Sequence, residues 1–252
     1  MDAPDKLVTA ALIIIGNEIL SGRTKDVNLN HIALKLTDHG IRMMECRVVP
    51  DVEDEIITAI NGLRAKFDYV FTTGGIGPTH DDITAACVAK AFGRKLICNP
   101  DAYEIMAAHY KILNVEFTTA RARMANTPEG ASLIENPVSV APGFQVENVF
   151  VMAGVPKIMQ AMLTSLLPSL VGGAKMLSAT LMCNLPEGDV AAGLGAIQQA
   201  CMDVEIGSYP AFASSDFRLS LVLRATDQSL LDAAITQTIG LIEELGGTYQ
   251  RK

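Results

Sequence analysis

The chain is poor in the features that mark disulfide-rich, zinc-binding and nucleic-acid-binding proteins. Its five cysteines are scattered, odd in number and never spaced as C-x-x-C, so the sequence indicates neither a disulfide framework nor a zinc site. Asp and Glu outnumber Lys and Arg by 28 to 20, and the net charge of −8 argues against nucleic acid or an anionic membrane as partner. We expect buried, reduced thiols.

Signals for export or membrane insertion are missing as well. Residues 1–6 contain no basic segment followed by an apolar one, as a secretory leader would. The apolar run of residues 8–15 is too short to cross a bilayer. We therefore expect a cytoplasmic protein.

Apolar periodicity predicts alternating strands and helices in the first part of the chain. Residues 8–15, 41–49 and 69–71 are rich in apolar and β-branched residues, as expected for strands. The segments between and after them show helical spacing. Their predicted inner faces are Leu29, Ile32, Ala33 and Leu36; Ile56, Ala59, Ile60 and Leu63; and Ile83, Ala86 and Cys87. Asp51 is predicted to cap the second of these helices.

This alternation is typical of an α/β fold with a doubly wound, mostly parallel sheet, whose ligands bind at the carboxyl ends of the strands. Short strands at 131–134 and 149–152 and a helix that begins at Pro156 complete the domain. Residues 141–143 are predicted to form a loop.

Gly172-Gly173 is predicted to be a flexible joint between two domains, residues 1–172 and 173–252. After it, strand and helix patterns follow in the order β-α-β-β-α. This order indicates a small α+β domain of ferredoxin-like type. We find no catalytic constellation in it.

Residues 72–84, with the sequence TTGGIGPTHDDIT, have the pattern of a ligand site. Three glycines follow a predicted strand and precede a predicted helix, where free backbone amides attract anions and glycine lets a ligand approach them. Asp81 and Asp82 follow, and they would repel a phosphate unless a cation such as Mg²⁺ lay between. The spacing matches neither the P-loop nor the dinucleotide-binding motif.

A purely structural interpretation of this segment stays open. Thr79 and Asp82 fit the S/T-x-x-D/E signal of a helix start, which satisfies the free amides without a ligand. His80, Arg121 and Arg123 would either contact a phosphate or lie exposed on the surface.

Four ordered motifs give the chain a strong resemblance to the molybdopterin-binding domain family. They are residues 16–22 (GNEILSG), the glycine segment, residues 141–143 (APG) and residues 154–156 (GVP). Within the family the chain resembles the N-terminal part of the competence/damage-inducible protein A group, which is similar to the pterin-binding domain of eukaryotic FAD synthases. The resemblance reaches the C-terminus, because residues 206–210 (IGSYP) look like that group's second domain.

The resemblance implies a three-layer fold and a set of site residues. Asp82 and Asp81 would be catalytic, and with Glu18 they would bind a divalent ion such as Mg²⁺, Mn²⁺ or Co²⁺. The implied ligand-binding residues are Gly16, Asn17, Glu18, Asn28, Thr73, Gly74, Gly75, Gly77, Pro78, Thr79, Pro142, Gly143 and Gly154. Asn17 replaces an aspartate that is usual in the family, so one negative charge is lost near the ion.

Three functions are compatible with this resemblance. The favoured one is hydrolysis of a nucleotide pyrophosphate such as ADP-ribose or FAD, with glycine amides on the phosphates and a metal ion that activates water. The second is molybdopterin binding or pterin adenylylation in molybdenum-cofactor biosynthesis, and the third is nucleotide or pterin binding without turnover. The resemblance also implies a homo-oligomer. It implies no deamidation, since the chain ends at Lys252 without the amidohydrolase domain that the group often carries.

Overall fold

The computed structural model describes residues 7–211 and 217–252. The chain divides into two compact units, Met1–Gly173 and Ala174–Lys252, and this division falls one residue after the predicted boundary. Residues 1–6, where the sequence predicts no leader, lie outside the described residues. No helix in the described part is long and apolar enough to cross a membrane.

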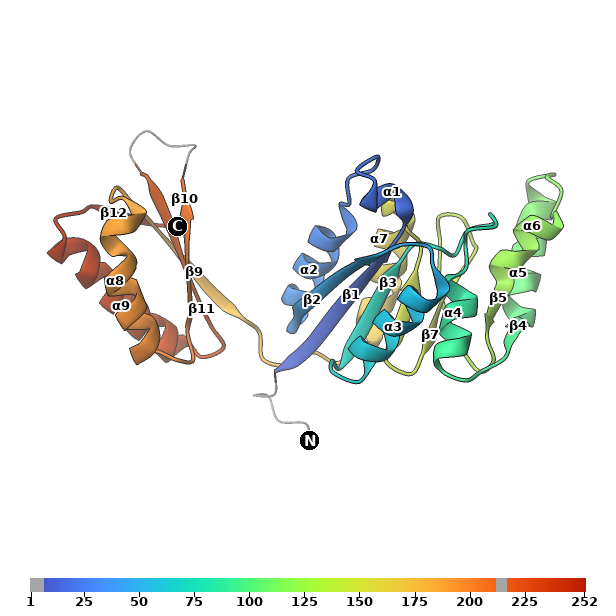
Figure 1. The fold of residues 1–252 in the computed structure, drawn as a ribbon, viewed down its shortest axis with the longest axis horizontal. Coiled ribbons are helices and arrows are strands. Elements are labelled where there is room, and N and C mark those ends of the chain that lie inside the picture. Colours follow the sequence, from blue (N-terminus) through green and yellow to red (C-terminus); the bar gives the residue numbers. More distant parts are fainter. Residues whose placement is uncertain (1–6, 212–216) are drawn as a thin grey trace. The chain divides into compact units, whose positions relative to one another are not determined.

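The first unit is built around a six-stranded sheet of order β2-β1-β3-β8-β7-β6 (Figure 1). Strands β1, β2, β3 and β8 run parallel, and β7 is antiparallel to both of its neighbours. The elements are β1 (Val8–Ile15), α1 (Asn17–Leu20), α2 (Asn28–Asp38), β2 (Ile41–Val49), α3 (Glu53–Arg64), β3 (Tyr69–Thr73), α4 (Thr84–Ala91), β4 (Leu96–Cys98), α5 (Pro100–Ile112), α6 (Thr119–Ala122), β5 (Asn126–Pro128), β6 (Ser132–Ile134), β7 (Gly143–Val146), β8 (Val149–Met152) and α7 (Pro156–Leu166). The predicted α/β class is confirmed.

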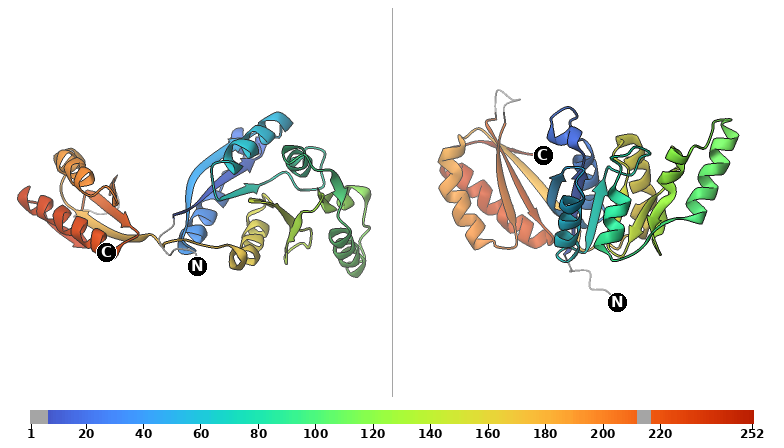
Figure 2. Two further views of the ribbon diagram at one scale, coloured as in Figure 1. Left: turned by 90° about the horizontal axis from the view of Figure 1, so that it is seen from below. Right: turned by 45° about the vertical axis from the view of Figure 1, so that its right-hand side comes forward.

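Helices cover both faces of this sheet, which gives three layers (Figure 2, left). Helices α2 and α7 pack on one face, in a core that includes Leu12 and Phe71. Helices α3 and α4 pack on the other face, in a core that includes Ile13 and Val70. Strand β1 is buried on both faces because its side chains are almost all apolar.

The second unit is an antiparallel sheet of order β10-β11-β9-β12 with two helices packed on it. Its elements are β9 (Leu177–Cys183), α8 (Glu187–Ala200), β10 (Glu205–Pro210), β11 (Leu219–Ala225), α9 (Gln228–Glu244) and β12 (Tyr249–Arg251). The predicted α+β arrangement is confirmed. Strand β12 was not predicted, because its three residues are exposed and show no apolar pattern.

Three short strands of the first unit also escaped prediction. Strands β4 and β5 form a separate two-stranded sheet, and β7 begins at Gly143, where a loop was predicted. A Cβ on Gly143 would lie 2.4 Å from the carbonyl oxygen of Val151, so a glycine here reflects close strand packing instead of a turn. Strands of three or four residues are too short to show a period.

Gly172 and Gly173 lie at the end of the first unit and contact its α2 turn, and the flexibility of this joint stays a prediction. A Cβ on Gly172 would lie 1.8 Å from the carbonyl oxygen of His39. The amide of Gly173 donates a hydrogen bond to the carbonyl of Gly40, at 3.0 Å. The two glycines are therefore packed against the turn that follows α2, where a side chain would not fit.

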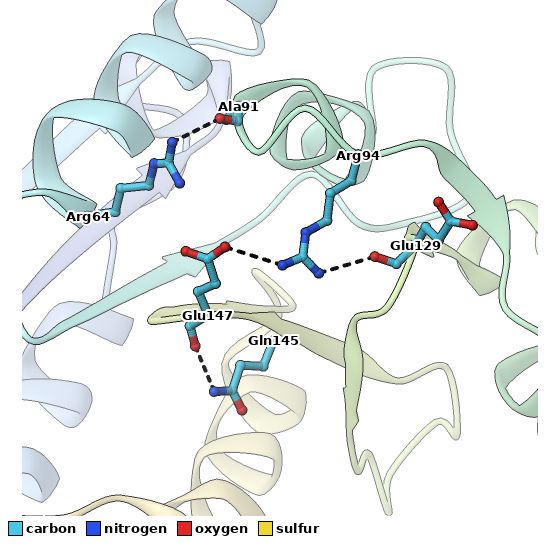
Figure 3. A network of polar contacts seen from close by, with 6 residues as sticks. All are labelled: Arg64, Ala91, Arg94, Glu129, Gln145 and Glu147. Carbon is cyan, nitrogen blue, oxygen red and sulfur yellow. Dashed lines mark hydrogen bonds and ion pairs between the residues drawn. The ribbon is translucent and has the colours of Figure 1, made fainter.

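Two arginines of the first unit are held by polar contacts (Figure 3). Arg94 donates to the carbonyl of Glu129 at 3.2 Å and pairs with the carboxylate of Glu147 at 3.3 Å. Arg64 donates to the carbonyl of Ala91 at 3.1 Å. These contacts link α3 and the end of α4 to the β7–β8 hairpin and leave neither guanidinium without a partner.

Candidate functional site

Three loops meet at the carboxyl edge of the parallel strands. Gly74, directly after β3, has a φ of 104°, and a Cβ there would lie 2.1 Å from the carbonyl oxygen of Ile15 at the end of β1. A Cβ on Gly154, after β8, would lie 3.2 Å from the Cα of Gly74. Only glycine permits such approaches of backbone to backbone. The glycine turn thus sits between the ends of β1 and β8.

These loops line an open cleft of about 530 Å³. The predicted site residues that line it are Gly16, Glu18, Gly74, Gly75, Gly77, Pro78, Thr79, Asp81, Asp82 and Gly154. Both predicted segments, residues 16–18 and the glycine turn, therefore face one cleft.

Asn28 and Thr73 lie behind the cleft. Asn28 is buried and donates a hydrogen bond from its side-chain nitrogen to the carbonyl of Gly154, at 2.8 Å. Thr73 is buried at the end of β3. Asn28 is thus placed to support the Gly154 loop.

Asn17, Pro142 and Gly143 are also absent from the lining of the cleft. Asn17 is exposed and uses its backbone amide, which donates to the carboxylate of Asp51 at 2.9 Å. Gly143 is buried within β7, whereas Pro142 lines a smaller pocket of about 80 Å³.

The predicted role of Asp51 as a helix cap is wrong. It was predicted to cap α3, but the N-cap residue is Val52 and no side chain caps this helix. Asp51 instead lines the cleft beside the first loop. Its position two residues after the end of β2, at the carboxyl end of a parallel strand, was the signal that could have revealed it.

The cleft is strongly acidic. It is lined by four carboxylates, those of Glu18, Asp51, Asp81 and Asp82. Among the residues that the structure describes, no Lys, Arg or His lines it. A bare phosphate would therefore be repelled unless a cation accompanied it.

Asp82 organises the glycine turn and does not mark a helix start. The amide and the hydroxyl of Thr79 both donate to Oδ2 of Asp82, at 2.8 and 2.5 Å. Helix α4 begins only at Thr84, whose hydroxyl donates to the carbonyl of Gly74 at 3.1 Å. A Cβ on Gly77 would lie 2.7 Å from Oδ2 of Asp82. Asp82 is thus fixed against the turn by Thr79.

Asp81 is exposed beside it and is readily ionised. Hydrogen bonding with the Thr79 side chain, and then with its own backbone amide, lowers the pKa of Asp81. The Thr79 hydroxyl has a single proton and lies 2.5 Å from Asp82, so the two carboxylates compete for it. An ionised carboxylate is the form that binds cations.

Glu18 bends back over Gly16. A Cβ on Gly16 would lie 2.5 Å from both carboxylate oxygens of Glu18. The missing side chain at position 16 therefore makes room for the Glu18 carboxylate at the end of β1.

The carboxylates of the cleft are the side chains that could contribute to a cation site. The described residues contain no group of three or more His, Cys, Asp or Glu side chains that could hold a metal ion by themselves. Mg²⁺, however, is often held by one or two carboxylates together with waters and substrate phosphates. Hard oxygen donors such as Asp82, Asp81 and Glu18 fit that mode.

Two cysteines of the first unit, Cys46 and Cys87, are unsuited to nucleophilic chemistry. Burial raises the pKa of Cys46 and of Cys87 to about 11. Both thiols therefore stay protonated near neutral pH and are poor nucleophiles.

The sequence left open whether Arg121, Arg123 and His80 lie near the ligand site, and the structure places the three differently. Arg121 donates to the carbonyl of Glu116, and its guanidinium lies 4.9 Å from the centre of the Tyr110 ring. Arg123 instead lines the smaller pocket, together with part of the glycine turn. His80 is exposed and is not part of the cleft lining.

The fold and the cleft together define an α/β domain of the class that takes ligands at the carboxyl edge of its sheet. Residues 11–171 match the family described as "Probable molybdopterin binding domain", and residues 175–246 match "FAD synthase, middle domain". The chain belongs to the molybdopterin-binding domain family, so the predicted resemblance is confirmed.

Relatives of known sequence or structure agree with this assignment. The chain is 38% identical to a CinA-like protein of Desulfosudis oleivorans, over 74% of this chain and 49% of that protein, and it therefore spans about half of that relative's length. It is 33% identical to a protein of Pyrobaculum calidifontis, over 93% of this chain and 96% of the other. It also resembles the crystal structure of the protein CinA, of unknown function, from Thermoplasma acidophilum. The TM-score is 0.59 at 37% identity, with 66% of this chain and 99% of that chain covered.

Proposed function

We propose that the protein hydrolyses the pyrophosphate bond of a nucleotide such as ADP-ribose or FAD, assisted by a divalent cation. One observation carries this proposal: the glycine turn and four carboxylates line the same cleft, and its described lining contains no basic side chain. Backbone amides of a glycine turn attract phosphate oxygens, whereas the carboxylates require a cation beside them. A metal-bound pyrophosphate satisfies both.

The residues of the cleft have separate roles in this proposal. The amides of Gly75 and Gly77 orient the phosphates, whereas the Gly74 amide donates to the carbonyl of Met152 at 3.2 Å. Asp82, Asp81 and Glu18 hold the ion, which when bound polarises a phosphoryl group and lowers the pKa of a water molecule. Thr79 positions Asp82 through its two hydrogen bonds.

Two other functions have support of their own. The match to a molybdopterin-binding domain over residues 11–171 favours pterin binding or pterin adenylylation in molybdenum-cofactor synthesis. Binding of a nucleotide or pterin without turnover is the third, and the absence of a three-ligand metal cluster among the described residues supports it. The match of residues 175–246 to a domain of FAD synthase favours a nucleotide as the ligand.

We also propose a cytoplasmic location for the protein. The five cysteines are unpaired, which supports a reducing compartment such as the cytoplasm. A homo-oligomer remains a prediction of the resemblance.

Product analysis tests the proposed reaction. The protein is incubated with ADP-ribose, FAD, or ATP with a pterin, each with Mg²⁺, Mn²⁺ or Co²⁺, and the products are resolved by chromatography. We expect AMP from ADP-ribose or FAD. If no ion supports cleavage of either compound, the hydrolase proposal is wrong; an adenylylated pterin would instead select the second function.

Paired variants tie the reaction to the glycine turn. Asp82→Asn removes one negative charge and keeps an oxygen that can accept from Thr79, so we expect at least about a 100-fold loss of AMP formation. Asp38→Asn removes an exposed charge at the end of α2 and should leave the rate unchanged. Equal rates for both variants would place the reaction elsewhere.

A further inference from the structure

The small pocket that contains Arg123 adjoins the main cleft across the glycine turn. The two share Gly75, Ile76, Gly77, Asp82 and Met124 as lining residues. With a volume of about 80 Å³, the pocket is far smaller than typical sites for whole small-molecule ligands, which take roughly 300–1,000 Å³. It has room for a single chemical group.

Arg123 distinguishes this pocket from the cleft. Its walls combine apolar side chains with the polar residues Asp82 and Asn126. Among the residues that the structure describes, Arg123 is the one basic side chain that lines this pocket, and none lines the cleft. Within residues 7–211 and 217–252, the guanidinium of Arg123 has no hydrogen-bond or ion-pair partner. By contrast, Arg64 and Arg94 are engaged (Figure 3), and so is Arg121.

Arg123 is exposed, so its guanidinium is accessible to an anion that enters the pocket. A planar guanidinium can donate two parallel hydrogen bonds to a phosphate, which is the geometry of the stronger charge-assisted contacts. Asp82 lies in the same pocket, but its Oδ2 is already engaged by Thr79 at 2.8 and 2.5 Å. The two sides of the glycine turn therefore differ in charge: the cleft is lined by four acidic side chains, whereas the small pocket is lined by one acidic side chain, Asp82, and one basic side chain, Arg123.

We infer that the Arg123 pocket is a subsite for a phosphoryl group of the ligand, which Arg123 binds directly while the acidic cleft takes the cation-bound part. The subsite deepens the proposed function and rests on it, since both require a ligand that carries phosphate. Arg123 is then a specificity-determining residue that separates a nucleotide from the corresponding nucleoside.

Binding measurements with AMP and adenosine test the subsite, because the two differ by one phosphoryl group. Calorimetric titrations in Mg²⁺ would compare the wild type with Arg123→Gln and Arg123→Lys. Loss of a charge-assisted contact should weaken AMP binding by about 10- to 100-fold in Arg123→Gln and leave adenosine unchanged. Arg123→Lys keeps the positive charge but lacks the planar guanidinium that donates two parallel hydrogen bonds. Its affinity for AMP should therefore lie between those of the wild type and Arg123→Gln.

Arg121→Gln is the matched control, since Arg121 lies two residues away but is engaged by Glu116 and Tyr110. It should bind AMP as the wild type does. Thermal unfolding of each variant would show that it is folded.

Three results would overturn the subsite: unchanged AMP affinity in Arg123→Gln, equal binding of AMP and adenosine by the wild type, or no AMP binding at all. Hydrolysis of ADP-ribose gives a separate readout. Binding through Arg123 without cleavage would refute the hydrolase proposal and leave the subsite standing. If Arg123→Gln cleaves ADP-ribose with the same KM as the wild type, the hydrolase proposal stands and the subsite is refuted.

Discussion

The two units of the chain are built from similar elements but differ in how their loops are distributed. In the first unit β1, β2, β3 and β8 are parallel, so the segments that follow them leave the sheet at one edge. Glu18, Asp51, the glycine turn and Gly154 consequently line one cleft. In the second unit neighbouring strands are antiparallel, and the loops alternate between the two ends of the sheet. Strand direction therefore concentrates the candidate site.

Turn glycines of the two units offer the sharpest test of this difference. Gly74 and Gly246 both have positive φ, 104° and 72°, but a Cβ on Gly74 meets the Ile15 carbonyl at 2.1 Å and one on Gly246 meets nothing within 4 Å. Gly74→Ala should lower the free energy of unfolding by roughly 3 kcal/mol or more, because strain and a backbone clash add. Gly246→Ala should cost only the conformational strain of roughly 1–2 kcal/mol. Equal losses in urea unfolding would contradict the close loop packing.

Helix α8 provides a test confined to the second unit. A Cβ on Gly193 would lie 2.3 Å from Cδ1 of Leu241 in α9, so Gly193→Ala should destabilise this unit by roughly 1–3 kcal/mol. Gly195 has nothing within 4 Å, and Gly195→Ala should stabilise the helix by roughly 0.5–1 kcal/mol. Neither change should alter nucleotide binding under conditions in which the protein is folded. A weaker affinity in Gly193→Ala would show that the site is not confined to the first unit.

Gly16→Ala separates the role of a glycine in the site from its role in stability. The new Cβ would displace the Glu18 carboxylate, an exposed side chain that can move at little cost in stability. We expect AMP formation to fall by about 10-fold with little change in the melting temperature. Glu18→Gln should produce a similar loss. Full activity in both variants would remove Glu18 from the proposed ion site.

The smallest effect is expected from the pH dependence of Asp81. Its pKa is lowered in the folded state, so its contribution to stability is present above the ordinary carboxyl pKa and is lost as pH falls through the lowered value. In Asp81→Asn this contribution should be absent at every pH. A nuclear magnetic resonance titration of the Asp81 carboxyl would show the pKa directly; a value above the ordinary one would contradict the Thr79 contact.

Local patterns were sufficient for the long elements of both units. The predicted strands at 8–15 and 41–49 agree with the structure because they are long and rich in apolar residues, and the inner face of α3 agrees because its apolar residues follow the helical period. Strands β7 and β12 were missed because they are short, and β12 is also exposed. The glycine segment was located from its own composition, since three glycines between a strand and a helix need no tertiary information.

Long-range contacts explain what the sequence could not provide. Asp51 reached the cleft because β2 pairs with β1, and this pairing joins residues far apart in the chain. Arg121 and Arg123 have the same chemistry and lie two positions apart, yet a tertiary pocket separates their roles. The contact of Gly172 with His39 also joins distant segments, so the sequence alone could not show it.

The central claim is that the acidic cleft accepts a phosphate only together with a divalent cation, and calorimetric titration of ADP-ribose with and without Mg²⁺ tests it most directly. The four carboxylates and the lack of Lys, Arg or His in the described lining predict binding at least about 10-fold tighter with Mg²⁺ than in excess EDTA. Equal or tighter binding in EDTA would contradict the claim.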